Sequence, residues 1–94
     1  MHHDLKIWPT FFERQLDRKK PWEVRRMDRK FDAGDTATLR EWDPTHQKYT
    51  GRSVFGRIPF VMAEVMGIKE GYCVFTFDAE TVRSDDFPAE EVAA

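Results

Sequence analysis

A proline between a helical pattern and a strand pattern constrains the fold of this chain more than any other feature. Within residues 18–26 the apolar spacing of a helix gives way directly to the alternation of a strand. Pro21 has no backbone N–H and disfavours the helical conformation at Lys20, so the preceding helix must end there. The sequence therefore predicts an abrupt helix-to-strand junction, and it lies in the densest cluster of charges in the chain.

The strand predicted after this junction has two different faces. Side chains alternate along residues 22–27, as they do in any β-strand. Trp22 and Val24 share one face, which we expect to pack in the core. Glu23 and Arg25 share the other face, which then points to solvent or into a polar cleft.

A short strand and one helix are predicted before the junction. Residues 3–7 alternate weakly and form a candidate first strand. Pro9 suits the first turn of a helix, where its missing N–H would have no partner. Trp8, Phe12 and Leu16 recur at helical spacing, and we expect them to form the stripe that faces the core.

Three further strands are predicted after the junction, over residues 36–42, 52–65 and 72–77. The middle run is too long for a flat strand, and Gly56 and Pro59 predict that it bends or bulges. The predicted order is β-α-β-β-β-β. This is an α+β, mostly β domain of about five strands with one main helix after the first strand, curled into a sheet or small open barrel.

Length and charge divide the chain unequally. Its 94 residues fit one domain with one modest core, which we place at residues 1–78. Residues 79–94 are expected to form an acidic tail that is partly disordered from about residue 84. The net charge of −2 hides this asymmetry, because residues 78–94 carry −5 and residues 1–77 carry +3.

The sequence predicts a cytoplasmic protein. No apolar run approaches the roughly 20 residues that a membrane helix needs, and residues 1–4 lack the pattern of a signal peptide. Cys73 is the only cysteine, so it cannot form an internal disulfide, which agrees with a reducing compartment.

A basic segment surrounds the junction. Residues 13–30 contain eight Lys or Arg and four Asp or Glu. Such an excess of positive charge favours anionic partners, including nucleotides and nucleic acids. A solvated surface is the other origin of such a segment, and charge alone does not separate the two.

Lys20, Glu23 and Arg25 form the candidate site. In a cleft, the Lys20 ammonium can stabilise an oxyanion while Glu23 moves protons. On an open surface, Glu23 and Arg25 would form an ion pair worth about 0–1 kcal/mol. Glu64 is either the polar end of a strand or the lip of a cleft. No spacing typical of a zinc site or a phosphate-binding loop occurs, so we expect no metal and no cofactor.

The spacing of these residues resembles a known signature. Lys20-x-x-Glu23-x-Arg25 is similar to the G-x-K-x-x-E-x-R motif of ASCH domains, small barrels related to the PUA fold. The resemblance runs from residue 3 to about residue 78 and is closest to an uncharacterised bacterial and phage branch. It also rests on residues 3–7, 25–31, 34–35, 39–43, 49–52 and 68–72. Arg18 stands where the motif has its glycine, so the turn before Lys20 must form without it.

The resemblance implies one of two functions. PUA-like domains as a class bind RNA, which implies a non-catalytic RNA-binding module that uses the basic residues from Arg14 to Lys30. Some small ASCH proteins are instead amidohydrolases that cleave N4-acetylcytidine and related N4-acylcytidines to cytidine and a carboxylic acid. The second function implies a modified nucleoside as the small-molecule partner and no metal in the reaction.

The catalytic set of those amidohydrolases is a Lys, a Thr three residues later and a more distant Glu. Lys20 matches the Lys, Glu23 occupies the Thr position, and Glu64 is the best placement for the distant Glu. We therefore hypothesise that Glu23 activates a water and returns its proton to the leaving nitrogen, while Lys20 stabilises the oxyanion. Arg25 and Arg26 would hold the carboxylate or contact the ribose. The predicted substrate-binding residues are Arg25, Arg26, Trp22 and Tyr72.

Overall fold

The computed structural model of the 94-residue chain describes residues 1–63, 67–85 and 87–91, the last range by its backbone only. These parts are mostly β-strand with one helix, as the sequence predicted. The elements are β1 (His2–Ile7), α1 (Pro9–Leu16), β2 (Trp22–Arg26), β3 (Thr36–Asp43), β4 (Lys48–Arg57), β5 (Val61–Ala63), β6 (Tyr72–Thr76), β7 (Asp78–Ser84) and β8 (Phe87–Glu91).

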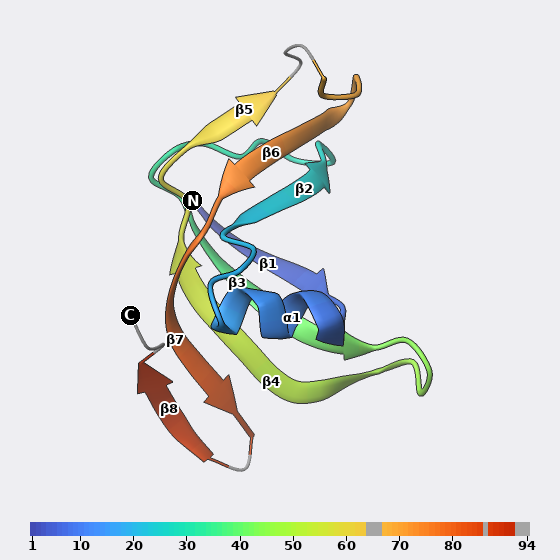
Figure 1. Ribbon diagram of the computed structural model, residues 1–94, viewed down its shortest axis with the longest axis vertical. Helices are drawn as coiled ribbons and strands as arrows, with labels where there is room; N and C mark the ends of the chain where they lie inside the picture. Colours follow the sequence, from blue (N-terminus) through green and yellow to red (C-terminus); the bar gives the residue numbers. More distant parts are fainter. Residues whose placement is uncertain (64–66, 86, 92–94) are drawn as a thin grey trace.

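The described strands form two sheets (Figure 1). The larger sheet has five strands in the order β1-β3-β4-β7-β8, with β1 parallel to β3 and the other pairs antiparallel. The smaller sheet has three antiparallel strands in the order β2-β6-β5. The chain passes from β6 directly into β7, so this segment joins the two sheets.

Helix α1 lies against the larger sheet (Figure 1). Pro9 occupies its first turn, Phe12 is fully buried, and Leu16 packs against the core, as predicted. Trp8 differs from the prediction, because its side chain is 55% exposed. It precedes the first helical residue and has an extended backbone, so it does not follow the helical spacing. In the described parts of the chain no helix is long and apolar enough to cross a membrane.

The core lies between the two sheets and the helix. Strand β6 contributes Cys73 and Phe75, and Phe77 follows on the same face, as the alternation predicted. The buried apolar residues are Leu5, Ile7, Phe12, Phe31, Ala37, Leu39, Val54, Ile58, Cys73, Phe75, Phe77 and Ala79.

Strand β2 turns the opposite face to the core from the one predicted. Trp22 and Val24 are 43% and 57% exposed, whereas Glu23 is only 3% exposed. The cause is the register with β6, because Glu23 lies directly opposite the buried Phe75 and therefore on the same face. The alternation assigned the residues to the two faces correctly. The expectation that the face with Trp22 and Val24 is the buried one was wrong.

The long run predicted over residues 52–65 is broken into two strands. Strand β4 ends at Arg57 and β5 begins at Val61, so the chain moves from the larger sheet to the smaller one within this run. The predicted bend at Gly56 is confirmed as a bulge against β7. A Cβ at this position would lie 2.2 Å from the Asp78 carbonyl oxygen, so the close approach of the two backbones requires glycine.

The larger sheet continues past residue 78, where the sequence placed the start of a tail. Strand β7 pairs with β4, and β8 pairs with β7 in turn. Ala79 is buried and Val82 packs against the core. The first part of the acidic segment therefore belongs to the fold, because it pairs with β4 and its apolar side chains reach the core.

Candidate functional site

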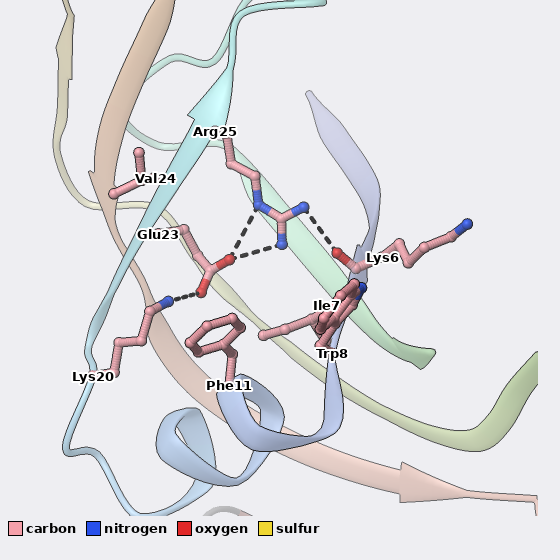
Figure 2. A pocket seen from close by; sticks show the side chains of 8 residues that line it. All are labelled: Lys6, Ile7, Trp8, Phe11, Lys20, Glu23, Val24 and Arg25. Atoms are coloured by element: carbon pink, nitrogen blue, oxygen red, sulfur yellow. Dashed lines mark hydrogen bonds and ion pairs between the residues drawn. The ribbon is translucent and has the colours of Figure 1, made fainter. Parts of the chain in front are cut away.

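A hollow of about 470 Å³ opens where α1, the end of β1 and β2 meet (Figure 2). One wall is apolar and includes the exposed aromatic rings of Trp8 and Phe11. The opposite wall carries charged side chains from β2 and from Lys20, two residues before this strand. The volume falls within the range of roughly 300–1,000 Å³ that is usual for ligand pockets. The lining residues are Lys6, Ile7, Trp8, Phe11, Lys20, Glu23, Val24 and Arg25.

The Glu23 carboxylate is the centre of the charged wall. Its Oε2 accepts hydrogen bonds from Lys20 Nζ at 2.6 Å and from Gln15 Nε2 at 2.8 Å. Its Oε1 accepts two from Arg25, from Nε at 3.1 Å and from Nη2 at 2.7 Å. A carboxylate offers about four acceptor positions, so these donors occupy all of them. Contacts to two cations offset the cost of burying the charge.

Backbone carbonyl groups hold the two cations in place. Lys20 Nζ donates to the Trp22 carbonyl oxygen at 2.8 Å, and Arg25 Nη1 donates to the Lys6 carbonyl oxygen at 2.9 Å. An ammonium has three N–H donors, so one donor of Lys20 is not engaged by the described residues. The Lys20 ammonium lies 5.3 Å from the centre of the Phe11 ring, at the boundary between the charged and apolar walls.

The charged wall has an excess of positive charge. Lys20 and Arg25 supply two cations against the single carboxylate of Glu23. Both cationic side chains are only 20% exposed, so water and salt screen them less than they screen surface groups. The cluster is therefore not an ion pair on an open surface. A negative charge that develops beside Lys20 would be stabilised.

Arg18 makes the turn that carries Lys20 to the site. Its φ of 59° lies in the left-handed region, where glycine is usual at the end of a helix. The backbone N–H groups of Lys19 and Lys20 both donate to the Arg14 carbonyl oxygen, at 3.1 and 3.3 Å, and so close the helix end. The Arg18 guanidinium donates to the Ala79 carbonyl oxygen at 3.2 Å. The turn thus forms without the glycine of the ASCH motif.

Gln15 is a site residue that the sequence reasoning missed. Its side chain is buried, and its Nε2 donates to Glu23 and to the Trp22 carbonyl oxygen, the latter at 3.1 Å. A signal was available, because Gln15 lies three residues after Phe12 and therefore on the buried face of the helix. A buried amide needs a polar partner, so its presence there predicts a polar group below α1.

The hollow does not include every predicted site residue. Trp22 and Arg26 are exposed and do not line it, although Val24, on the same face of β2, does. Tyr72 lines a different hollow of about 280 Å³, with the Lys69 ammonium 5.6 Å from its ring centre. Glu64 lies outside the described residues.

Several cations of the basic segment over residues 13–30 lie near carboxylates. Arg14, Arg29 and Lys30 lie 3.8, 3.2 and 3.8 Å from carboxylate oxygens of neighbouring residues. Arg25 and Lys20 are engaged by Glu23. The segment as a whole still carries more Lys and Arg than Asp and Glu, and RNA binding through it stays a prediction.

The described residues offer little else for chemistry at the hollow. They contain no group of three or more His, Cys, Asp or Glu side chains that could hold a metal ion. Cys73 lies opposite Arg25 in the small sheet, and burial raises the pKa of its thiol, which favours the unreactive protonated form. Apart from Lys6, the charged side chains that line the hollow are therefore Lys20, Glu23 and Arg25.

A comparison with protein families covers most of the chain. A family model described as Domain of unknown function (DUF3850) matches residues 2–77, a range that includes the whole charged wall. A curated relative is the uncharacterized 12.9 kDa protein in the GpA 3′ region of Escherichia phage P2, which is 39% identical over 56 residues. The match covers 60% of this chain and 50% of the phage protein, so the chain spans about half the length of the curated relative it matches.

Proposed function

The chain belongs to the DUF3850 family, and we propose that it is a metal-independent amidohydrolase acting on N4-acylated cytidines. It would cleave the N4-acyl amide of N4-acetylcytidine or a related compound to cytidine and a carboxylic acid. One observation carries this proposal. A buried carboxylate is bonded to an ammonium at 2.6 Å in the wall of a partly apolar hollow. Lys20 and Glu23 also occupy the Lys and Glu positions of the ASCH motif.

The hollow suits a planar base that carries a small acyl group. Trp8 and Phe11 provide exposed aromatic surface, on which a pyrimidine ring can stack. Lys20 provides a donor for the acyl oxygen. A volume of about 470 Å³ accommodates a ligand the size of a nucleoside. Shape and chemistry therefore favour a small aromatic amide as the substrate.

The reaction begins with attack of water on the acyl carbon. The Lys20 ammonium donates to the acyl oxygen and stabilises the negative charge of the tetrahedral intermediate. Glu23 takes the proton from the attacking water. The bond between the acyl carbon and N4 then breaks, and Glu23 returns the proton to the leaving nitrogen. The products are cytidine and the carboxylic acid.

The resting site must change before Glu23 can act as a base, because all its acceptor positions are occupied. Lys20 is the donor that can leave, since the acyl oxygen of the substrate offers it another acceptor. Its shift toward the developing oxyanion frees Oε2 for the proton of water. Gln15 and Arg25 remain bound and keep the carboxylate oriented. Substrate binding and activation of the base are thereby coupled.

The resemblance to the ASCH motif also leads us to propose that the two sheets form the open barrel of a PUA-like domain. Two features support this assignment. The chain enters β2 through a tight turn after α1, and the Lys-Glu-Arg cluster lies at that junction. We propose a cytoplasmic protein that needs no cofactor and takes a modified nucleoside as its partner.

The proposal is tested by measuring cytidine released from N4-acetylcytidine with wild type, Lys20→Ala and Glu23→Gln. We expect wild type to release cytidine and each variant to lose at least about 100-fold in kcat/KM, the usual contribution of a general acid–base group. Lys19→Ala is the matched control, because Lys19 is exposed and does not line the hollow. Full activity in Glu23→Gln would contradict the mechanism.

The alternative of a non-catalytic RNA-binding module is decided by the same preparation. It requires that wild type release no cytidine from any N4-acylated cytidine. It also requires RNA binding whose affinity falls steeply as salt is raised, because phosphate contacts release counterions. Release of cytidine by wild type and its loss in Glu23→Gln would exclude it.

A further inference from the structure

A second hollow lies on the other face of the larger sheet. It has a volume of about 410 Å³ and is lined by side chains from β3, β4 and β7. On β3 these side chains alternate with the buried Ala37 and Leu39, and on β4 they flank the buried Val54. They therefore point away from the core, from α1 and from the first hollow. The lining residues are Thr38, Arg40, Ser53, Phe55, Thr81 and Arg83.

Strand register places two arginines on either side of a serine. Arg40 on β3 lies opposite Ser53 on β4, and Ser53 lies opposite Arg83 on β7. Side chains directly opposite on neighbouring strands have Cβ atoms about 4.5–5.5 Å apart. The two guanidinium groups therefore flank one hydroxyl in a row that crosses three strands.

The next row supplies an aromatic ring and two more hydroxyls. Phe55 lies between Thr38 and Thr81 in the register. Its ring stacks with the ring of His2 at 5.9 Å between centres and 20° between planes. The two nitrogens of His2 lie 2.7 Å from Thr36 Oγ1 and 3.1 Å from Thr38 Oγ1, which fixes this ring beside the hollow.

The lining of this hollow is positively charged. Among the described residues it contains two arginines and no carboxylate. Arg40 has a carboxylate neighbour outside the hollow, because its Nη2 lies 3.2 Å from Asp4 Oδ1. Arg83 forms no ion pair with the side chains that the structure describes. An adjoining hollow shares Arg40, Ser53 and Arg83 and includes Asp85, so the positive region has an acidic edge on that side.

We propose that this outer face binds the phosphate group of a ligand that also carries an aromatic base. Two guanidiniums with a hydroxyl between them match the charge and the several acceptor oxygens of a phosphate. The ring of Phe55 provides the adjacent apolar surface for the base. The ligand class is therefore a nucleotide, either free or as a unit of a single-stranded nucleic acid.

This site differs from the amidohydrolase site in residues, elements and chemistry. None of the residues that line it lines the first hollow. Loss of the phosphate site would not affect the groups around Glu23, and loss of Glu23 would not affect Arg40 or Arg83. The two proposals can therefore fail separately.

The test is binding to the full chain at low salt by three probes: inorganic phosphate, cytidine 5′-monophosphate and a fluorescein-labelled single-stranded RNA of about ten nucleotides. Calorimetry reports the first two and fluorescence anisotropy the third. We expect the double variant Arg40→Ala/Arg83→Ala to weaken binding at least about tenfold. For the RNA, it should also make the dependence of affinity on salt concentration less steep, by the equivalent of about two phosphate contacts.

Two control variants test whether the loss of binding is specific to Arg40 and Arg83. The comparison of probes then identifies the source of the phosphate. Arg57→Ala removes an exposed arginine of β4 that does not line the hollow and pairs with Glu80 at 2.8 Å, and it should leave binding unchanged. Glu23→Gln should also bind normally. Tight RNA binding with weak nucleotide binding identifies the ligand as a single-stranded nucleic acid. Comparable binding of the nucleotide and the RNA identifies it as a free nucleotide. If no probe binds, or if the double variant binds as wild type does, the proposal is overturned.

Discussion

Glu23 and Glu41 are two buried glutamates with nearly the same hydrogen-bonding pattern and different surroundings. Each is 3% exposed. Each accepts two hydrogen bonds from one arginine, Glu23 from Arg25 and Glu41 from Arg52. Glu41 also accepts one from the Thr50 hydroxyl at 2.6 Å. Burial and the contact with one arginine therefore do not distinguish the two glutamates.

Charge balance and open space separate them. The Arg52 guanidinium is shared by Glu41 and by Glu13 on α1, and it lies 4.7 Å from the centre of the Phe12 ring. Two anions thus share one cation, and the arrangement fastens the helix to the larger sheet. Glu23 has two cations and borders a hollow of about 470 Å³. A buried carboxylate becomes a candidate site when positive charge is in excess and a ligand can reach it.

The largest expected effect on stability comes from removing the shared arginine. Arg52→Ala leaves Glu41 buried without a cation and should lower the free energy of unfolding by about 2–3 kcal/mol, a figure reduced because Arg52 is 38% exposed. Lys20→Ala should cost only about 1 kcal/mol, because Gln15 and Arg25 still bond Glu23. Urea unfolding measures both values.

The control for this stability comparison is Arg57→Ala, which removes one partner of an exposed ion pair. Its effect should stay within about 0.5 kcal/mol. Equal losses of unfolding free energy in Arg52→Ala and Lys20→Ala would show that the two glutamates depend on their cations to the same degree. That result would contradict the expected difference between the two clusters.

Replacing each arginine by lysine should lower the activity in the Glu23 cluster and leave it nearly unchanged in the Glu41 cluster. Arg25→Lys loses the two-pronged contact that orients Glu23, so kcat for N4-acetylcytidine should fall about 10-fold while KM changes little. Arg52→Lys should keep kcat within about threefold of wild type, because Glu41 does not line the hollow. Steady-state kinetics measures both. A KM effect alone in Arg25→Lys would mean that Arg25 binds substrate and does not position the base.

The smallest expected effect is on the acid sensitivity of the structural cluster. Burial alone would raise the pKa of Glu41, but hydrogen bonds from Arg52 and Thr50 outweigh it and lower this pKa below its ordinary value. A lowered folded pKa gives stability that is present above the unfolded pKa, near 4.5, and is lost as pH falls through the folded value. Glu41→Gln should therefore be less stable at neutral pH.

Thermal unfolding between neutral pH and about pH 3 measures this difference. The melting temperatures of wild type and Glu41→Gln should converge by a few degrees as pH falls. The same sign holds at Asp35, whose pKa is lowered chiefly by the hydrogen bond with His3, and this contribution persists in both proteins. Parallel curves for wild type and Glu41→Gln would rule out a stabilising charge on Glu41.

Much of the fold could be predicted from local patterns. The alternation of β1 and β6 follows from residues close in sequence, and the structure confirms it. The apolar stripe of α1 is confirmed at Phe12 and Leu16 and was wrong at Trp8. The break between β4 and β5 and the continuation of the sheet into β7 and β8 were not predicted. They depend on pairing between distant strands, which no local pattern specifies.

The candidate site divides in the same way. Lys20, Glu23 and Arg25 could be grouped from their spacing, because Pro21 fixes the junction between them. That Glu23 is buried could not be predicted, because it follows from register with β6 and from partners such as Gln15 on another element. Polarity argued for exposure, and tertiary hydrogen bonds reversed it.

The most direct test of the central claim compares the two glutamates in one assay. Cytidine release from N4-acetylcytidine is measured for wild type, Glu23→Gln and Glu41→Gln under conditions where urea unfolding shows all three to be folded. The account predicts at least about a 100-fold loss in kcat/KM for Glu23→Gln and a change within about threefold for Glu41→Gln. Equal activity in the two variants, or no cytidine release by wild type, would contradict it.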